Sequence, residues 1–193
     1  MKRWIVGIVT LLALAGCQWS PLSQSKSDAY DRWYEARAKV LYGAGREHLK
    51  VGQLDKAAKK ARDALALAPE YTDARILLGK VLIEKGYYAQ AVNELTRARQ
   101  ERPQSAEALY LLAVAHEKSG DLPQALELYR SAQALDDSGV DAIVAAGEVL
   151  VQMGRVDEAR QLIRPYAATG QSEPALYELA GRLAMMQENY AAA

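Results

Sequence analysis

Small and apolar residues recur along most of the chain with a period of 34 residues. One set of alanines is Ala57, Ala91, Ala125 and Ala159, and a second set of small residues is Gly45, Gly79, Ala113, Gly147 and Gly181. Further glycines follow apolar stretches of helical spacing in the same register, at Gly52, Gly86, Gly120 and Gly154. A glycine in that place is typical of a helix C-terminus, where the capping residue needs a positive φ. The pattern predicts a repeated unit of helix, glycine turn and helix.

The register also sets the expected helix boundaries. The helices pair as 38–50 with 54–67, 72–85 with 88–101, 106–119 with 122–135, and 140–153 with 156–168, and one more helix covers 174–187. Glycine or alanine at a helix crossing lets two backbones approach closely. One such unit cannot bury its apolar face alone, so neighbouring units are expected to stack into an all-α solenoid.

These residues resemble the tetratricopeptide repeat, which also has a period of 34. The resemblance covers residues 38–193, with repeats at 38–71, 72–105, 106–139 and 140–173 and a partial repeat at 174–193. The second unit carries the pattern at Leu78, Gly79, Ala91, Leu95, Ala98 and Pro103, and the third carries it at Leu109, Leu112, Ala113, His116, Ala125, Tyr129 and Ala132. The position of the pattern's large aromatic residue on the second helix holds Ala61, Leu95, Tyr129 and Ile163 in turn, so it is aromatic in the third unit alone. The resemblance implies a right-handed α-solenoid that binds other proteins.

The resemblance further implies which residues line the concave face. In this family the first helix of each unit points positions 2, 5, 9 and 12 inward. The corresponding residues are Lys39, Tyr42, Arg46, Leu49, Asp73, Ile76, Lys80, Ile83, Glu107, Tyr110, Val114, Glu117, Asp141, Val144, Glu148 and Val151. Such a groove is basic at its N-terminal end and acidic toward the fourth unit, which suits an extended or helical peptide. The alternative is an ordinary solvated helix face.

The first 16 residues have the pattern of a secretory signal. A short basic start precedes the apolar run Trp4 to Ala15, which is shorter than the about 20 residues of a membrane-spanning helix. The run ends in Leu14-Ala15-Gly16-Cys17, which resembles the lipobox of bacterial lipoproteins. The resemblance implies cleavage before Cys17 and attachment of two or three acyl chains there, such as palmitate. A plain signal peptide with a chance cysteine is the alternative.

The segment after the expected cleavage site is rich in Ser and Gln, so residues 17–29 are predicted to be a flexible linker ahead of a helical domain at 30–193. Helical spacing of aromatic residues over 30–41 predicts an extension or cap of the first helix. Gln18 rather than Asp follows the cysteine. By resemblance to the enteric sorting rule, this favours the outer membrane and a domain that faces the periplasm.

The composition limits which kinds of binding or catalytic site the chain can form. The chain has 24 basic and 24 acidic residues, so its formal net charge is zero and nucleic acid is not an expected partner. One cysteine and two histidines leave little material for a metal site, and no cofactor motif or catalytic constellation stands out. His48 and His116 fall at a packing position of the repeat. We therefore expect a protein without enzymatic activity, without a metal and without a cofactor.

Two interpretations of the whole protein are consistent with the sequence. The chain is expected to be a lipid-anchored scaffold that holds proteins or peptides in envelope assembly, in the manner of a pilotin or an assembly factor. The alternative is the N-terminal interaction module of a longer chain that carries an enzyme or secretion domain after residue 193. The last helix lacks a covering partner in the sequence, so a homodimer through this C-terminal helix is a further expectation.

Overall fold

The computed structural model describes residues 21–136, 140–168 and 174–191, and within them the chain forms helices and no strands. The observed boundaries agree with the predicted ones to within one residue for most helices. The helices are α1 (Pro21–Lys50), α2 (Leu54–Leu67), α3 (Thr72–Glu84), α4 (Tyr88–Glu101), α5 (Ala106–Ser119), α6 (Leu122–Leu135), α7 (Val140–Gln152), α8 (Val156–Ala168) and α9 (Pro174–Ala191).

Each helical hairpin turns on a left-handed glycine. Gly52, Gly86, Gly120 and Gly154 have φ values of 71°, 76°, 89° and 74°. In the first turn, the amide of Gly52 donates to the carbonyl of Leu49 at 2.9 Å, and the amide of Gln53 donates to the carbonyl of His48 at 2.8 Å. This pair of hydrogen bonds is the Schellman motif, which satisfies the last carbonyls of a helix. The same pair of bonds recurs at all four glycines, so the hairpins share one geometry.

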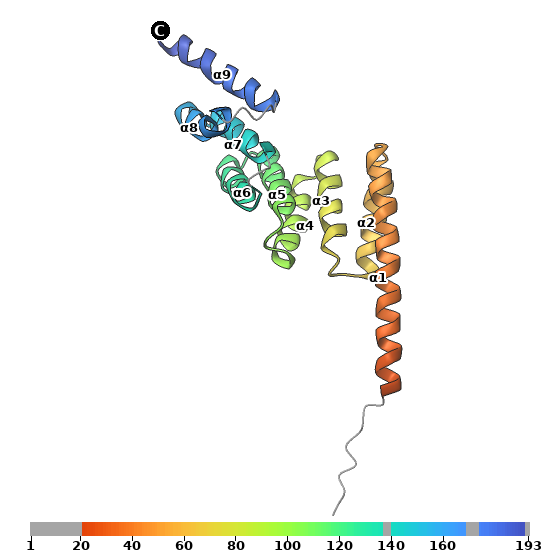
Figure 1. The fold of residues 1–193 in the computed structure, drawn as a ribbon. Helices are drawn as coiled ribbons and strands as arrows, with labels where there is room; N and C mark the ends of the chain where they lie inside the picture. Colours follow the sequence, from red (N-terminus) through yellow and green to blue (C-terminus); the bar gives the residue numbers. More distant parts are fainter. Residues whose placement is uncertain (1–20, 137–139, 169–173, 192–193) are drawn as a thin grey trace, which may run out of the picture.

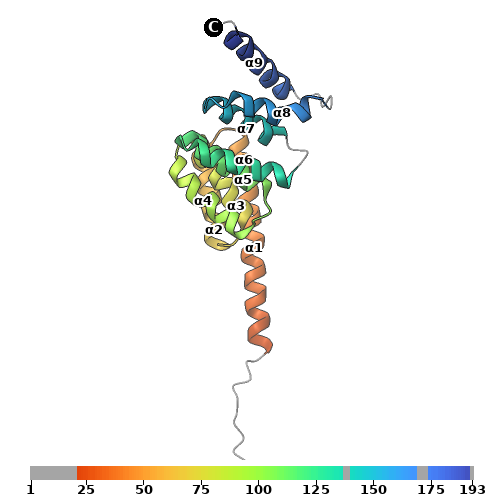
Figure 2. The same ribbon diagram turned by 90° about the vertical axis from the view of Figure 1, so that its left-hand side faces the viewer.

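The hairpins stack side by side into an elongated array (Figures 1 and 2). Each helix packs against the next one along the chain, and first helices also contact one another, as α1 does with α3 and α3 with α5. One apolar core runs from Ala57 on α2 to Leu183 on α9. The predicted all-α solenoid is therefore confirmed. None of the helices in the described ranges is both long and apolar enough to cross a bilayer.

Small residues lie where the helices approach most closely, as the period predicted. Ala57, Ala91, Ala125 and Ala159 on the second helices have no exposed surface. A Cβ atom added to Gly79 would lie only 2.5 Å from Cγ of Leu95, so α3 and α4 are in close contact at that point. The predicted series fails at Gly181, where an added Cβ atom would meet no neighbouring atom within 4 Å, because no second helix follows α9 among the described residues.

The second-helix position where the repeat pattern has a large aromatic residue is buried in every unit, although a different residue type occupies it each time. Ala61, Leu95, Tyr129 and Ile163 all have at most 4% of their surface exposed. Tyr129 of α6 keeps its hydroxyl satisfied by donating a hydrogen bond to the Glu117 carboxylate of α5 at 2.7 Å. Burial and this hydrogen bond raise the pKa of Tyr129 far above its usual range.

One cation is also buried in the second unit. Arg75 of α3 has 9% of its surface exposed and donates to Glu101 at 2.8 Å, to Glu94 at 3.1 Å and to the carbonyl of Pro69 at 2.5 Å. Both carboxylates belong to α4, so the guanidinium joins α3, α4 and the preceding loop. Three charge-assisted hydrogen bonds offset the loss of hydration that burial imposes on this charge.

The two ends of the chain differ from the prediction. Helix α1 begins at Pro21, so the linker expected at 17–29 is wrong from that residue on. Proline suits the first turn of a helix, and none of the residues that follow up to 29 is a glycine or a second proline. At the other end α9 continues to Ala191 instead of stopping at 187. Glu188 stands where the register would place the turn glycine, so nothing ends the helix there. Cys17 and the signal segment lie outside the described residues.

The Gly79 crossing can be tested with one substitution made at two glycines. Gly79→Ala places a methyl group against Leu95, so we expect a loss of about 1–3 kcal/mol of unfolding free energy through overpacking. Gly43→Ala on α1 meets no atom within 4 Å and is expected to gain about 0.5–1 kcal/mol through helix propensity. Urea denaturation followed by circular dichroism measures both. Equal effects at the two sites would contradict close packing at Gly79.

The Tyr129 hydrogen bond predicts a dependence on pH. Tyr129→Phe should cost about 1–2 kcal/mol at pH 7. Because the folded-state pKa of Tyr129 is raised, the stability linked to this hydroxyl is present below the ordinary tyrosine pKa near 10 and declines as pH rises above it. The gap between wild type and variant should therefore narrow above about pH 10. Tyr177→Phe, at a side chain that is 48% exposed, serves as the control. A gap that stays constant from pH 8 to pH 11 would disagree with this expectation.

Candidate functional site: a groove between the first helices

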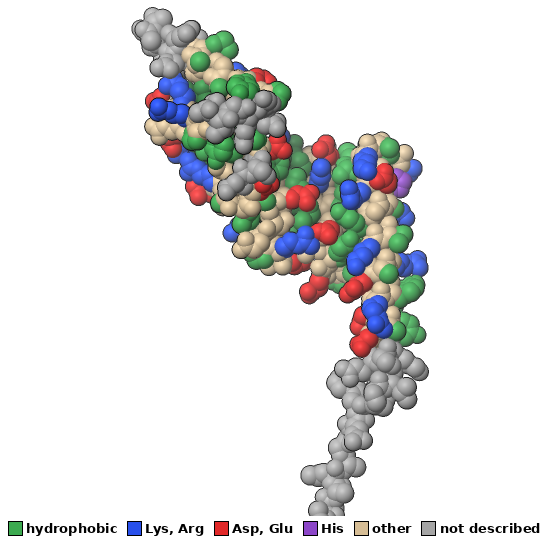
Figure 3. Space-filling model, in the orientation of Figure 1, with side chains coloured by type: hydrophobic (Ala, Val, Ile, Leu, Met, Phe, Trp, Pro, Cys, Tyr) green, Lys and Arg blue, Asp and Glu red, His purple; other side chains and the backbone are tan. Residues whose placement is uncertain are grey.

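A pocket lies between α1 and α3 and extends to α5. Its volume is about 470 Å³. Seven of the predicted groove residues line it together with Lys50 and Leu77, namely Tyr42, Arg46, Leu49, Asp73, Ile76, Lys80 and Glu107. Charged side chains of both signs surround the boundary between α1 and α3 (Figure 3). We call this cavity the groove pocket. The structure therefore brings together residues from three repeats that the sequence placed on one face.

The floor of the groove pocket is apolar and its wall is aromatic. Ile76 and Leu77 of α3 are buried, with 3% and 5% of their surface exposed. The ring of Tyr42 stands edge-on to the ring of Tyr71, with 5.4 Å between the centroids. The guanidinium of Arg46 lies over the Tyr42 ring, 5.7 Å from its centroid. This stacking holds the cation beside the pocket without neutralising it.

The charges of the groove pocket are unevenly paired. Lys50 forms an ion pair with Glu47 at 2.8 Å, and Asp73 forms one at 2.7 Å with Arg102, the residue that follows α4. Arg46 and Lys80 form no ion pair within the part of the chain that the structure describes. Glu107 of α5 also has no ion pair among these residues, so the pocket offers two cations and one carboxylate beside an apolar floor.

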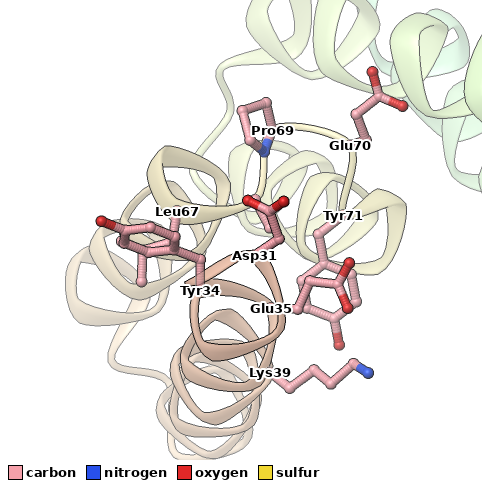
Figure 4. Close-up of a pocket in the computed structure, with 9 residues that line it drawn as sticks. Asp31, Tyr34, Glu35, Lys39, Leu67, Pro69, Glu70 and Tyr71 are labelled. Carbon is pink, nitrogen blue, oxygen red and sulfur yellow. The ribbon is translucent and has the colours of Figure 1, made fainter. Parts of the chain in front are cut away.

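Lys39 does not share this pocket. It lines a neighbouring hollow of about 460 Å³ between the N-terminal half of α1 and the loop that joins α2 to α3. Figure 4 shows Asp31, Tyr34 and Glu35 on the same helix, with Asp31 and Tyr34 on the side of Leu67 and Glu35 beside Tyr71. Tyr71 lines this hollow and contacts Tyr42, which lines the groove pocket, so the two rings separate the cavities.

The groove continues toward the fourth unit as a shallower surface. Glu107, Tyr110 and Asp141 line a hollow of about 220 Å³ between α5 and α7. Burial raises the pKa of Tyr110, and the nearby carboxylates of Asp141 and Glu117 raise it further. The predicted aliphatic residues of the groove are half-buried against the core, at Ile83, Val114, Val144 and Val151.

Like Asp73, two more of the predicted acidic residues are already engaged. Glu117 accepts hydrogen bonds from Tyr129 and, at 3.4 Å, from Gln152. Glu148 forms an ion pair with Arg182 of α9 at 2.7 Å. Sequence reasoning missed Arg182, although it lies 34 residues after Glu148, in the inward register of the fifth unit. The acidic end of the groove is therefore partly neutralised from within the solenoid.

The two histidines belong to the helix turns. The Nδ1 atom of His48 lies 3.0 Å from the side-chain oxygen of Gln53, and that of His116 lies 3.2 Å from the Asp121 carboxylate. Each contact spans a glycine turn and ties the end of a first helix to the residue before the second helix. Among the residues that the structure covers, no group of three or more His, Cys, Asp or Glu side chains could hold a metal ion.

Solved structures share this fold over most of the chain. MamA from Desulfovibrio magneticus RS-1 is 21% identical, with a TM-score of 0.66 over 79% of this chain and 90% of its own. YrrB, a tetratricopeptide repeat protein with an unusual peptide-binding site, is 19% identical, with a TM-score of 0.65 over 88% and 85%. The first repeat domain of Spaghetti (RPAP3), bound to the HSP90 peptide SRMEEVD, is 16% identical, with a TM-score of 0.61 over 62% and 95%. At these identities the likeness shows the fold alone.

Family profiles identify the repeats directly. Two profiles described as tetratricopeptide repeat match the sequence, one at residues 42–92 and 77–140 and the other at residues 117–183. No curated protein matches the sequence significantly. Proteins of this family are generally non-catalytic modules for protein–protein interaction. The matched residues span more than half of the sequence, and the chain belongs to the tetratricopeptide repeat family.

Proposed function

We propose that this protein is an interaction scaffold that binds a peptide segment of a partner protein along the groove pocket and the face that continues from it. The observation that carries the proposal is the groove pocket itself, where seven inward residues of three repeats surround one cavity of about 470 Å³. A cavity of that size accepts one or two side chains rather than a whole domain.

The chemistry of the pocket indicates what the peptide carries. Ile76 and Leu77 offer an apolar floor, whereas Arg46 and Lys80 are cations without an ion-pair partner in the described residues. An aliphatic side chain followed by a carboxylate fits both features, because the first is buried and the second pairs with the cations. The acidic face toward α7 then sets the direction of the peptide, since basic residues are favoured at that end.

Two of the similar structures support peptide binding as the mode of interaction. YrrB is described as having a peptide-binding site, and the Spaghetti domain holds an acidic peptide, SRMEEVD. The groove pocket of this chain need not bind such a peptide in the same way. In the family's carboxylate clamp, two asparagines and several lysines hold the peptide terminus, and Leu77 stands where the second of those asparagines would be.

We propose further that the scaffold is held in the bacterial envelope by lipids on Cys17, at the outer membrane and facing the periplasm. The support comes from the sequence: a basic start, a short apolar run and Leu14-Ala15-Gly16 directly before the only cysteine. Two or three acyl chains anchor a protein stably, whereas one chain alone gives marginal binding. The partner would then be an envelope protein, in line with a role in envelope assembly.

The alternative is that these repeats form the N-terminal module of a longer chain. Reading the gene beyond the codon for residue 193 decides between the two organisations. The homodimer through α9 also stays a prediction. Its apolar residues Leu176, Leu179 and Leu183 are buried, whereas Tyr177 and Met185 are 48% and 61% exposed.

The groove proposal predicts that reversing the charge of Lys39, Arg46 and Lys80 to Glu weakens partner binding without unfolding the chain. The partner is first identified by crosslinking in the native envelope, and its peptide is then titrated by fluorescence anisotropy. We expect the affinity to fall by about tenfold or more, because attraction to acidic groups becomes repulsion.

The matched control reverses Arg62, Arg97 and Arg99, which lie on the second helices α2 and α4 and change the net charge equally. This control should leave the affinity unchanged. The groove proposal fails if both triple variants bind the peptide as the wild type does, or if both weaken binding to the same extent.

The anchor proposal predicts that Cys17→Ser leaves an uncleaved and unlipidated precursor. Processing would stop because the lipid-bearing thiol is lost. Metabolic labelling with a radioactive fatty acid and the mass of the chain measure the two effects, and Ser20→Ala is the control. A Cys17→Ser chain that is still cut to the mature size would speak for an ordinary signal peptide.

A further inference from the structure

Helix α1 carries a stripe of residues on the side away from the groove. Its members are spaced alternately three and four residues apart, as Tyr30, Trp33, Arg37, Val40, Ala44 and Glu47, followed by Val51 directly after the end of the helix. We call this set the α1 stripe. A spacing of three and four is the seam of a left-handed coiled coil, in which side chains of one helix fit between those of another. Successive residues advance by about 100° around a helix, which places the α1 stripe roughly opposite Arg46 and the groove pocket.

The α1 stripe is exposed to solvent except at Ala44, which is half-buried. Helix α1 packs against α2 and α3, and none of the other described helices lies along it (Figure 1). The exposed fractions are 72% for Val40, 67% for Val51 and 65% for Tyr30. Hydrophobic side chains are visible along the outer edge of this helix (Figure 3). Exposed apolar residues that line up in one seam, rather than lying scattered, indicate a contact surface.

The α1 stripe is complementary to itself. Two copies placed antiparallel about residue 42 bring together pairs of positions whose numbers add up to 84: Trp33 meets Val51, Arg37 meets Glu47, and Val40 meets Ala44. Each large residue meets a smaller one, and the one cation of the stripe meets its one anion. A two-fold axis repeats each of these contacts, as in any interface formed by the same patch on both copies.

The charges also decide the direction of pairing. In a parallel pair Arg37 would face Arg37 and Glu47 would face Glu47, so both layers would repel. In the antiparallel pair Arg37 of each copy meets Glu47 of the other, so both contacts attract. Arg37 now lies over the Trp33 ring at 5.3 Å, and Glu47 pairs with Lys50 at the exposed surface, so both remain able to reach a second copy. Such exposed contacts are weak and can be exchanged.

We infer that a second copy of this chain covers the α1 stripe, in an antiparallel dimer joined by Arg37–Glu47 ion pairs on both sides of the two-fold axis. This surface is distinct from α9. The paired part of the seam, from Trp33 to Val51, is about 27 Å long and leaves Tyr30 beyond it, so the dimer lies at the small end of specific interfaces, with an expected dissociation constant of about 1–100 μM. Tethering to one membrane raises the local concentration and favours such a weak dimer.

Charge exchange on the full chain tests the inference. Two copies with different affinity tags are expressed together, solubilised in excess detergent, and co-captured through one tag. Wild-type copies should co-capture. Copies that both carry Arg37→Glu, or both Glu47→Arg, should lose co-capture by about tenfold because like charges then meet. An Arg37→Glu copy with a Glu47→Arg copy should regain it, since every pair is again opposite in sign.

Arg99→Glu on α4 is the matched control and should leave co-capture unchanged, and circular dichroism confirms that each variant is folded. Co-capture of wild-type copies to the same extent as the mixed variants is specific to the antiparallel register, because in a parallel pair the wild-type contacts join like charges and only the mixed variants would attract. The inference is overturned if wild-type copies do not co-capture, or if the charge-reversing substitutions at Arg37 and Glu47 leave co-capture unchanged. It is equally overturned if Tyr177→Ser on α9 abolishes co-capture while the α1 variants do not.

Discussion

Close approach of helix backbones is the constraint on which the whole solenoid depends. The alanines at positions 57, 91, 125 and 159 have no surface exposed to solvent, and a single carbon added at Gly79 would collide with Leu95. Neighbouring side chains interlock only when the helices stand this near to each other. The four left-handed glycines keep every hairpin at the same geometry, so one spacing is repeated along the array. The groove exists because that repetition puts corresponding residues of successive first helices side by side.

The period of 34 made most of the fold predictable from sequence. Helix boundaries, turn glycines and buried alanines all follow from a single register, because each unit meets the same neighbours. Arg75 was not predicted. It occupies a position that is Leu41, Leu109 and Ile143 in the other units, and a cation there is explained only by Glu94 and Glu101 on the next helix. The end of α9 was missed for the opposite reason, since the register expected a turn where Glu188 provides none.

The groove was predictable as a set of positions but not as a charge pattern. Seven inward residues do line one pocket, whereas Lys39 lines another, because the Tyr42–Tyr71 pair stands between the two cavities. Ion pairs between repeats, such as Glu148 with Arg182, neutralise side chains that the sequence alone would count as charged groups of the groove. A sequence gives the sign of each side chain, but the neighbouring repeat decides how much of that charge faces a ligand.

The length of α1 has a geometric consequence for an anchored dimer. This helix has 30 residues, and Pro21 stands 21 positions before residue 42. Two such helices arranged head to tail would hold their starting points about 63 Å apart. If both chains are tethered to the same bilayer, the joined helices must run parallel to its plane. The pair would then be fastened at two separate points, and both solenoids would stand at equal height above the lipid headgroups.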